Sequence, residues 1–268
     1  PASFNNVMFF HDPPKHTRLR RLVSKAFTAR MVNDLRPMIQ RQVDQLLDDV
    51  AAAGACDLVE LFTFPLPFTV ITELIGADTR RSDEVREWSG ILTQHLDPTV
   101  PADMDQMVHA AMEIRAHAED IIEWKRSQPA DDLLSALIAA EEDGETLSQD
   151  ELVEQVVFLY IAGHETTVNL LGNGALALLR DRDSYQLLGS DPSIRENVAD
   201  ELLRYDSPVQ FSRRVTVDEM VVRGTSMEAG ATVMLAIGGA GRDPEFWGDT
   251  ALDIDLRRAN AGEHLAFG

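Results

Sequence analysis

Residues 156–168 read Val-Val-Phe-Leu-Tyr-Ile-Ala-Gly-His-Glu-Thr-Thr-Val, and this stretch decides the fold class. Its first six residues are apolar on every face of a helix, which indicates a central, buried helix. Ser148 and Glu151 upstream have the spacing of a capping box, which predicts where that helix starts. No proline interrupts the chain from there to Arg180, so one helix is expected over residues 149–180, roughly 48 Å long.

The centre of this helix combines small, acidic and hydroxyl side chains. Ala162 and Gly163 remove bulk where something large could lie against the helix. Thr166 and Thr167 follow them by four residues, so either hydroxyl can bond the preceding carbonyl and loosen the helix. Glu165 beside Thr166 supplies an acid and a hydroxyl, the two parts of a short proton relay. A structural kink without chemistry explains the same spacing, so both interpretations stand.

Two other motifs do not fit this helix. A zinc-protease signature would need a second histidine four residues after His164, and Val168 stands there. Residues 172–177 match a loose dinucleotide-binding fingerprint, but that fingerprint belongs between a strand and a helix. The sequence therefore favours neither activity.

Composition narrows the class of protein. The 268 residues include one cysteine, 44% apolar and 26% charged residues, as in a soluble globular protein. A single cysteine excludes a disulfide framework and multi-cysteine metal sites. The net charge of −21 argues against nucleic-acid binding. No apolar run approaches the roughly 20 residues of a membrane span, and no signal pattern opens the chain. We expect a cytoplasmic protein without a membrane partner.

The spacing of apolar residues along the sequence changes once. Helical periodicity dominates from about residue 13 to 205, and short strands and a long coil are expected over 208–268, in one domain. Residues 13–33 contain no acid but six of the 24 basic residues. This basic window is either a solvated helix face or a docking site for an acidic partner.

Two further polar pairs have helical spacing. Asp12 precedes two prolines and is expected to cap a helix on which His16 and Arg20 share one face. Such a pair could bind a carboxylate or merely decorate the surface. Glu201 and Arg204 can bond each other or reach into the following coil, and they matter only if buried.

The order of these features resembles a bacterial cytochrome P450 along essentially the whole chain. The landmarks are His16-x-x-x-Arg20, the Ala162–Thr167 motif, Glu201-x-x-Arg204, the Arg214 segment, Arg242-Asp243-Pro244 and His264-Leu-Ala-Phe-Gly268. The resemblance implies a mainly α fold with small β-sheets, in which haem b is sandwiched against the long central helix.

The resemblance also implies roles for individual residues. Glu165 and Thr166 would be catalytic, delivering protons during dioxygen cleavage, and Glu201 with Arg204 would tie a helix to the coil. Haem contacts would come from His16, Arg20, Ala162, Gly163, Arg214 and His264. The substrate pocket would be lined by Phe158, Leu159, Val209, Gln210 and Phe211. The basic window would dock an acidic ferredoxin or flavodoxin that passes on electrons from NAD(P)H.

The sequence departs from the family pattern in three places. Gly241 replaces the usual Asn before Arg-Asp-Pro, and Asp253 holds the place of the coil arginine, for which Arg257 or Arg258 could substitute. The iron-ligating cysteine is expected beyond Gly268, which predicts a chain incomplete at both ends and no metal ligand within it. Cys56 is far upstream and is expected to be a structural or surface thiol.

Two functions follow from this comparison. The first is a haem-thiolate monooxygenase whose activity belongs to a longer parent and acts on a small apolar organic molecule, the 268 residues alone being inactive. The alternative is a non-catalytic helical binding protein that holds haem weakly or not at all. A peroxide-driven or rearranging relative is a third possibility, against which the Glu165–Thr166 pair argues mildly. The sequence does not select a substrate.

Overall fold

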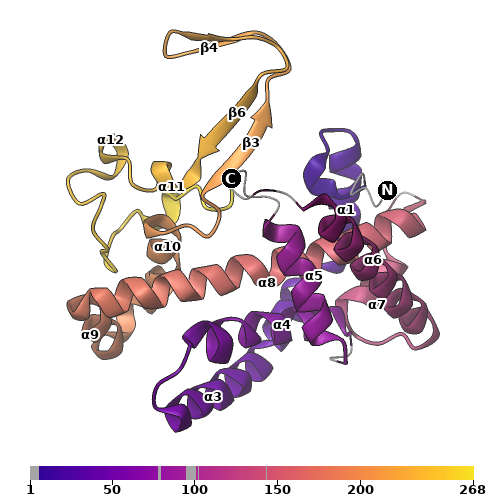
Figure 1. Cartoon of the computed structure of the whole chain (residues 1–268), viewed down its shortest axis with the longest axis horizontal. Helices are drawn as coiled ribbons and strands as arrows, with labels where there is room; N and C mark the ends of the chain where they lie inside the picture. Colours follow the sequence, from indigo (N-terminus) through magenta and orange to yellow (C-terminus); the bar gives the residue numbers. More distant parts are fainter. Residues whose placement is uncertain (1–5, 78–79, 95–100, 102, 143) are drawn as a thin grey trace. The chain divides into compact units, whose positions relative to one another are not determined.

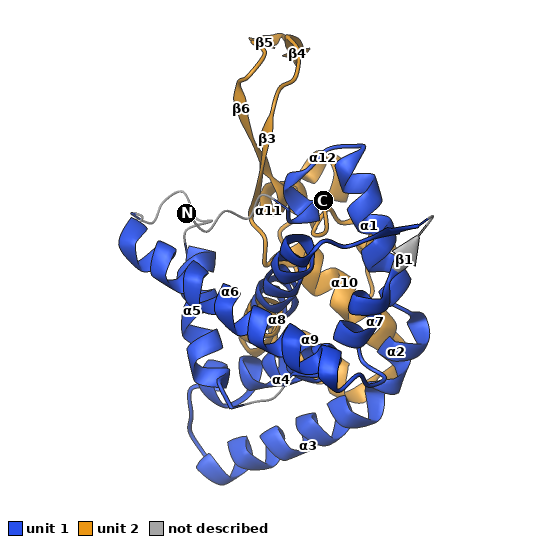
Figure 2. Ribbon diagram, turned by 90° about the vertical axis from the view of Figure 1, so that its right-hand side faces the viewer, with its two compact units in different colours: residues 1–168 blue, residues 169–268 orange. Residues whose placement is uncertain are grey.

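The structure is a computed structural model that describes residues 6–77, 80–94, 101, 103–142 and 144–268. Within these residues it divides into two compact units, residues 1–168 and 169–268, and the boundary falls inside the longest helix (Figure 2).

Unit 1 is helical and is built around the first part of the long helix α8 (Figure 1). Its helices are α1 (Lys15–Ala26), α2 (Ala29–Asp34), α3 (Arg36–Ala53), α4 (Pro65–Ile75), α5 (Ser82–Gln94), α6 (Met104–Ser127), α7 (Leu133–Ala139) and α8 (Gln149–Arg180), with short turns η1 (Met8–Phe10) and η2 (Val59–Thr63) and strands β1 (Glu141–Glu142) and β2 (Glu145–Thr146). Helices α1, α4, α5, α6 and α7 bury their apolar faces together with α8 in one core.

Helix α8 has the bounds that the sequence predicts. The Ser148 amide donates to Glu151 Oε2 over 2.9 Å, and the Glu151 amide donates to Ser148 Oγ over 3.3 Å, which is the reciprocal capping box. Arg115 from α6 adds ion pairs to Asp150 at 2.5 Å and Glu154 at 3.5 Å. The first turns of α8 are therefore held by local capping and by charges from a neighbouring helix.

The start of α1 differs from the prediction. Asp12 does not cap this helix, which begins at Lys15 after Pro14 and has no side-chain cap. Asp12 instead contributes its backbone carbonyl, which accepts from the His16 amide over 3.1 Å. Two consecutive prolines delay the helix because neither carries an amide proton and the residue before a proline avoids helical angles.

Unit 2 contains the end of α8, further helices and small sheets. These elements are α9 (Arg182–Ser190), η3 (Pro192–Ile194), α10 (Arg195–Tyr205), β3 (Phe211–Val215), β4 (Met220–Val222), β5 (Thr225–Met227), β6 (Thr232–Ala236), α11 (Ile237–Ala240), α12 (Pro244–Trp247) and η4 (Ala261–Glu263). A small core around Leu178, Ile194 and Leu256 joins α8, η3 and the coil.

The strands pair locally. Strand β3 is antiparallel to β6, with Phe211 opposite Ala236, and β4 is antiparallel to β5. Arg223 and Gly224 connect β4 to β5 with φ of +48° and +83°, the positive angles that a two-residue hairpin turn requires. The mainly α fold with small antiparallel sheets is the expected class.

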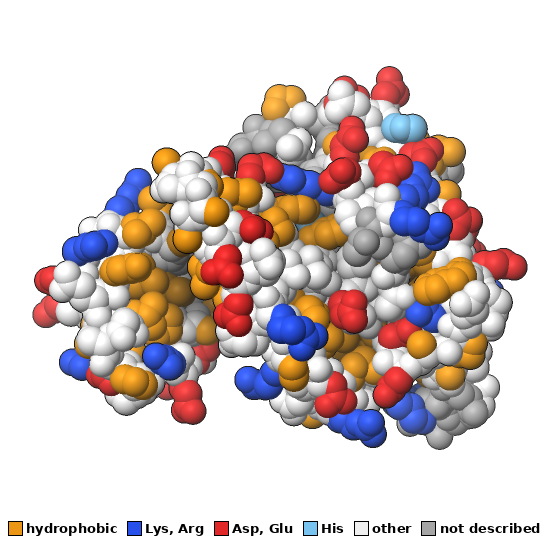
Figure 3. All heavy atoms as spheres, turned by 90° about the horizontal axis from the view of Figure 1, so that it is seen from below, with side chains coloured by type: hydrophobic (Ala, Val, Ile, Leu, Met, Phe, Trp, Pro, Cys, Tyr) orange, Lys and Arg blue, Asp and Glu red, His pale blue; other side chains and the backbone are white. Residues whose placement is uncertain are grey.

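Surface charge is mixed rather than segregated on the face drawn in Figure 3, where acidic and basic side chains lie interspersed among apolar ones. Part of the basic window is paired within unit 1, since Arg18 bonds Glu151 and Arg30 lies 3.5 Å from Asp34. Among the described residues, no helix is both long and apolar enough to cross a membrane.

Candidate functional site

The centre of α8 carries an unusual set of side-chain hydrogen bonds to its own backbone. Three side chains each reach the carbonyl four residues earlier, namely His164 Nδ1 to Tyr160 O at 2.5 Å, Thr166 Oγ1 to Ala162 O at 2.9 Å and Thr167 Oγ1 to Gly163 O at 3.4 Å. Such bonds compete with the helical amides for the same carbonyls and loosen the helix locally. The turn at residues 160–167 is therefore the part of α8 best able to adjust around a ligand.

This turn also differs from its surroundings in burial. The preceding turns are closed, with Val153, Val156 and Val157 at most 1% exposed. Ala162 and Thr166, in contrast, are half-buried. The helix thus presents a small residue and a hydroxyl on surface that the described part of unit 1 does not cover.

Gly163 is constrained by its neighbour on α4. A Cβ added there would lie 2.6 Å from the Ile71 Cδ1 atom, which is closer than carbon atoms approach in folded proteins. A methyl group at this position would displace the end of the Ile71 side chain, so the packing of α4 on α8 favours a glycine here.

His164 is the most enclosed polar side chain of the turn, with no exposed surface. The rings of Phe64 and Phe68 approach its imidazole edge-on, at 5.8 and 5.6 Å between centroids. Ser89 Oγ on α5 lies 3.2 Å from His164 Nε2. Burial lowers the pKa of His164 below its usual 6.5, against smaller opposing effects from the Tyr160 carbonyl and Glu165, so the ring is neutral near pH 7.

Glu165 is half-buried beside this ring. Its Oε2 atom lies 3.7 Å from His164 Nε2, beyond hydrogen-bond distance. The next residue, Thr166, holds its hydroxyl against the helix.

The other residues expected near a cofactor in unit 1 lie on α1. His16 is half-buried and Arg20 exposed, four residues apart on one helix face. The buried face of α1 carries Leu19 and Leu22, so the helix presents polar donors outward from an apolar anchor. The pair can bind a carboxylate-bearing ligand.

Phe158 and Leu159, two of the expected pocket residues, are half-buried one turn before the polar centre of α8. The Phe158 ring stacks on Phe9 of η1 at 5.8 Å between centroids and 26° between planes. Phe9 remains 66% exposed. An aromatic pair thus borders the loosened turn, and Phe9 is a residue that the sequence interpretation missed.

In unit 2 the expected pair Glu201 and Arg204 is fully buried and forms two parallel bonds of 2.7 and 2.8 Å. Arg204 also donates to three coil carbonyls, those of Gly241 at 2.7 Å, Ala251 at 2.8 Å and Asp253 at 2.8 Å. The pair therefore bonds internally and reaches the coil as well.

The structure distinguishes the two candidate arginines of the coil. Arg258 is buried and lies 3.1 Å from Glu201 Oε2, so it is the third charged member of this network. Arg257 is exposed and pairs with Asp191 at 2.7 Å instead. Asp253 contributes only its backbone carbonyl.

The remaining expected site residues lie in unit 2. The His264 side chain is 5% exposed, accepts from the Ala266 amide over 3.1 Å and places Nε2 3.7 Å from Asp200. Arg214 is exposed on β3 and donates to Ser212 and to the Arg213 carbonyl. The other three are the exposed residues Val209, Gln210 and Phe211.

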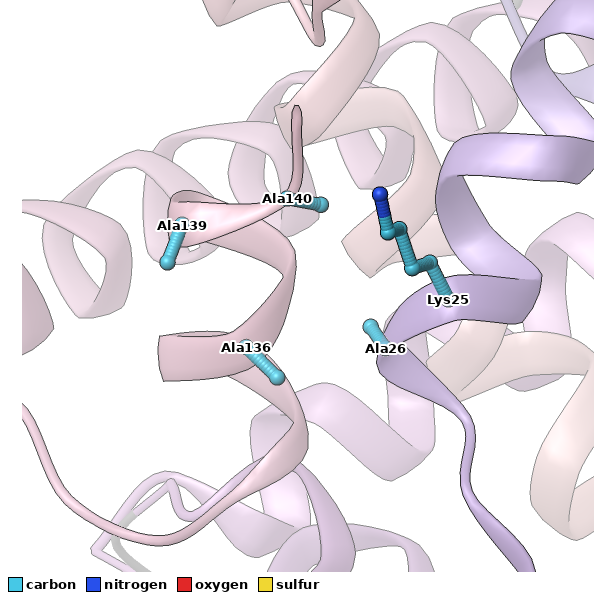
Figure 4. Close-up of a pocket in the computed structure, with 5 residues that line it drawn as sticks. All are labelled: Lys25, Ala26, Ala136, Ala139 and Ala140. Atoms are coloured by element: carbon cyan, nitrogen blue, oxygen red, sulfur yellow. The ribbon is translucent and has the colours of Figure 1, made fainter. Parts of the chain in front are cut away.

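A groove of about 330 Å³ opens elsewhere in unit 1, between α1 and α7 (Figure 4). It is lined by Lys25, Ala26, Ala136, Ala139 and Ala140. The Lys25 side chain extends across it toward Ala140. The groove contains none of the residues that the sequence singled out as catalytic or cofactor-binding.

The described residues thus include a loosened, buried helix that carries an acid and a hydroxyl, and a buried Glu-Arg network at a coil. The family model for cytochrome P450 matches residues 2–188 and 194–253. The chain belongs to the cytochrome P450 family.

Curated relatives from bacteria agree with this assignment. The chain is 43% identical over 258 residues to cytochrome P450 107B1 of Saccharopolyspora erythraea, covering 96% of this chain and 62% of the relative. It is 42% identical to the vitamin D(3) 25-hydroxylase of Pseudonocardia autotrophica, covering 100% and 66%. The cytochrome P450 monooxygenase PikC of Streptomyces venezuelae is 41% identical, with 100% and 63% covered. The chain thus spans about two thirds of the length of these relatives.

Solved structures agree in fold. The polyketide synthase cytochrome P450 PksS of Bacillus subtilis superposes with a TM-score of 0.92 at 35% identity, covering 100% of this chain and 68% of that one. P450BioI in complex with an acyl carrier protein ligated to hexadec-9Z-enoic acid gives 0.91 at 32% identity, covering 98% and 68%. These matches favour a haem enzyme over a haem-free binding protein.

The residues of unit 1 fit the cofactor that this family implies. Haem is a flat, largely apolar group with two carboxylates. The half-buried surface at Ala162 and Thr166 suits the flat face, and the polar face of α1 with His16 and Arg20 suits a carboxylate.

Proposed function

We propose that the whole protein is a haem-dependent monooxygenase that inserts one oxygen atom of O2 into a small organic substrate. The observation that carries this proposal is the turn at residues 160–167, where an acid and a hydroxyl lie on the half-buried surface of a loosened helix. When bound, haem supplies the redox chemistry of dioxygen, and the protein contributes orientation, protons and exclusion of water.

In this proposal, His16, Arg20, Arg214 and His264 would contact the haem propionates. Ala162 and Gly163 would leave room for the haem beside α8. Cys56, which is exposed in the loop after α3, serves as a surface thiol rather than as the iron ligand.

Glu165 and Thr166 are proposed to form the proton path. The Thr166 hydroxyl has one proton and now donates it to the Ala162 carbonyl over 2.9 Å. Rotation about one side-chain bond would release that proton toward a ligand, and the Glu165 carboxyl could replace it from the solvent side. In this proposal, these two groups take part in bringing a proton from bulk water to a bound ligand.

The partners proposed are an acidic ferredoxin or flavodoxin, which delivers electrons from NAD(P)H, and a small apolar substrate. Exposed Arg21 and Lys25 on α1 provide positive charge for the first. Phe158 and Leu159 in unit 1 are proposed to contact the substrate, and the same role is proposed for Val209, Gln210 and Phe211 in unit 2. The relatives named above act on different molecules, so the proposal extends only to the apolar character of the substrate.

The first experiment tests the class of enzyme. The gene that contains residues 1–268 is expressed at full length. The purified protein is reduced and exposed to carbon monoxide, and we expect the absorption band of a haem-thiolate protein. Cys56→Ser should retain this band, because Cys56 is proposed to be a surface thiol and not the iron ligand. Folded, haem-loaded protein that lacks the band would contradict the proposal.

The second experiment tests the proton path. Thr166→Ala removes the hydroxyl but retains the small apolar surface, so we expect electrons to be diverted from product to hydrogen peroxide. The ratio of peroxide to product, measured against NAD(P)H consumed, should rise about tenfold, because one positioned proton donor contributes at least that much. Thr167→Ala is the matched control, since the Thr167 hydroxyl bonds the helix in the same way. An unchanged ratio in Thr166→Ala would remove Thr166 from the path.

A further inference from the structure

The segment of residues 6–10, which precedes α1, is attached to α8 through one asparagine. The Asn6 amide and the Asn6 side-chain Nδ2 donate to the two carboxylate oxygens of Glu154, over 2.6 and 3.1 Å. The Asn6 carbonyl accepts from Gln155 Nε2 over 2.7 Å, and Asn6 Oδ1 accepts from Lys15 Nζ over 2.9 Å. Asn6 is therefore bonded to two consecutive residues of α8 and to the first residue of α1.

The Glu154 carboxylate is the buried part of this contact. Glu154 is 5% exposed, and Arg115 on α6 lies 3.5 Å from its Oε1 atom. A carboxylate that is removed from water needs hydrogen-bond donors, and bonds to a charged acceptor are stronger than bonds between neutral groups. Because Asn6 supplies a donor to each oxygen, detaching the segment would cost the carboxylate both bonds. These two bonds, the Asn6–Glu154 clamp, therefore fix the segment on α8.

Two exposed aromatic rings follow the clamp along the chain. Val7 has no exposed surface, whereas Phe9 and Phe10 are 66% and 57% exposed. These two rings meet edge-on at 5.3 Å between centroids, and the Phe9 ring also stacks on Phe158 of α8. A segment anchored at Asn6 and Val7 thus holds an aromatic pair, Phe9 and Phe158, whose outer ring remains largely exposed.

The clamp and the aromatic pair lie in line with the α8 turn. Successive members of one series are four residues apart and are therefore neighbours on the helix surface, namely Glu154, Phe158, Ala162 and Thr166. Glu154 is buried, whereas the other three are half-buried. The aromatic pair thus lies between the clamp and the half-buried surface that is proposed to face the reaction.

We propose that Asn6 is a positioning residue. Through the clamp it holds Phe9 against Phe158, and this aromatic pair contacts a flat, apolar ring of the substrate. Stacked rings attract each other beyond the area that they bury, and a ring that is already held in place loses little freedom when a ligand binds. The inference rests on the proposed function, to which it adds the kind of group that the substrate presents to this pair.

The first measurement follows the segment itself. The amides of Phe10 and His11 are hydrogen-bonded within the segment, over 3.1 and 3.2 Å, so their hydrogen exchange reports whether it is held. In the full-length protein, Asn6→Asp places a second carboxylate against Glu154 and should raise both exchange rates about tenfold, as for the loss of one hydrogen bond. Asn6→Asp/Glu154→Gln exchanges donor and acceptor, so the new amide can donate to the new carboxylate and slow exchange should return.

The second measurement follows a ligand with and without a ring. Imidazole and 4-phenylimidazole both bind haem iron through a ring nitrogen, and only the second carries a flat, apolar phenyl group. Their dissociation constants are measured from the shift of the haem absorption band in the full-length, haem-loaded protein. Phe9→Ala should weaken 4-phenylimidazole about fivefold, the size of one stacking contact, and leave imidazole unchanged. Asn6→Asp should cause the same selective loss, and Asn6→Asp/Glu154→Gln should reverse it.

Asn33→Asp on α2 is the matched control for the added charge. Asn33 is exposed, and its Oδ1 atom accepts from Arg36 Nε over 3.2 Å, a bond that a carboxylate can also accept. We expect this variant to change neither the hydrogen exchange of residues 10 and 11 nor the preference for 4-phenylimidazole over imidazole.

The inference is overturned if Phe9→Ala weakens both ligands equally or weakens neither. It is also overturned if Asn6→Asp speeds exchange without a selective loss of 4-phenylimidazole, because the clamp would then have only a structural role, or if Asn6→Asp/Glu154→Gln recovers neither property. Folded protein in which neither ligand shifts a haem band would contradict the proposed function, and this inference with it, even where the exchange results hold.

Discussion

Two regions of this molecule bury charged or titratable side chains, and they treat them differently. Around Glu201, all five guanidinium N–H donors of Arg204 are used, two by the carboxylate and three by coil carbonyls. Around His164, the ring nitrogen Nε2 lies near two polar groups, Ser89 Oγ and the Glu165 carboxyl. The Glu165 carboxyl lies beyond hydrogen-bond distance from this nitrogen. Because every N–H donor of Arg204 is bonded, the Glu201–Arg204 network can adopt a single arrangement. The side chains of the α8 turn can be hydrogen-bonded in more than one way. The buried ion pair of Glu201 and Arg204 therefore holds the coil in unit 2. The side chains of the α8 turn are less completely bonded, and this turn in unit 1 remains adjustable.

The largest expected effect comes from breaking the saturated network. Arg204→Met leaves the buried carboxylate of Glu201 with only Arg258 as its charged partner, which should cost about 3–5 kcal/mol of unfolding free energy. Urea unfolding of the full-length protein measures this loss. Arg257→Ala, which removes the exposed ion pair with Asp191, should leave the midpoint unchanged. Equal midpoints for the two variants would show that the buried network does not stabilise the coil.

A smaller loss of stability is expected when a methyl group is added at the tight contact between the α8 turn and α4. Gly163→Ala places a methyl group against Ile71 and should destabilise the protein by about 1–3 kcal/mol. Adding Ile71→Val should recover part of that loss, as measured by the same unfolding curves. Gly90→Ala on α5 meets nothing within 4 Å and should instead stabilise by about 0.5–1 kcal/mol. Additive losses in Gly163→Ala/Ile71→Val would contradict direct packing.

The neutral state of His164 predicts a pH dependence of stability. Because burial lowers its pKa in the folded state, the unfolded chain binds the proton more readily below pH 6.5. Its contribution to stability is therefore complete above pH 6.5 and declines as the pH falls toward the folded pKa, by at most about 1.4 kcal/mol per pH unit. Comparing unfolding at pH 5, 6 and 8 with His164→Gln, which does not titrate, isolates this contribution. Parallel curves for the two proteins would mean that His164 is already charged when folded.

The smallest effect concerns Asp191 in unit 2. Hydrogen bonds from Ser193 and Arg257 lower the pKa of its carboxyl to about 2. Its folded-state contribution is thus present above its ordinary value of 3.8 and is lost as the pH falls through about 2. Carboxyl NMR should record this titration, and Arg257→Gln should move it upward without affecting His164. Since Ser193 is the larger cause, Ser193→Ala should move it further than Arg257→Gln does.

Local spacing predicts a large part of this protein. The capping box and the uninterrupted apolar run determine α8, and the same kind of periodicity predicts the helix at residues 195–205 and the strands after it. Local prediction failed at Asp12, where two prolines displace the helix start. Spacing works where the interacting groups lie within one or two turns of each other, because the backbone alone then sets their distance.

The sequence by itself determined the family, the long helix and the residues of the acid–hydroxyl turn. Only the tertiary structure decided which groups those residues meet. Ser89 and His164 are 75 positions apart, and the choice of Arg258 over Arg257 depends on how a coil folds back 57 positions to Glu201. Such contacts are set by packing and desolvation of the whole unit, and no local pattern encodes them.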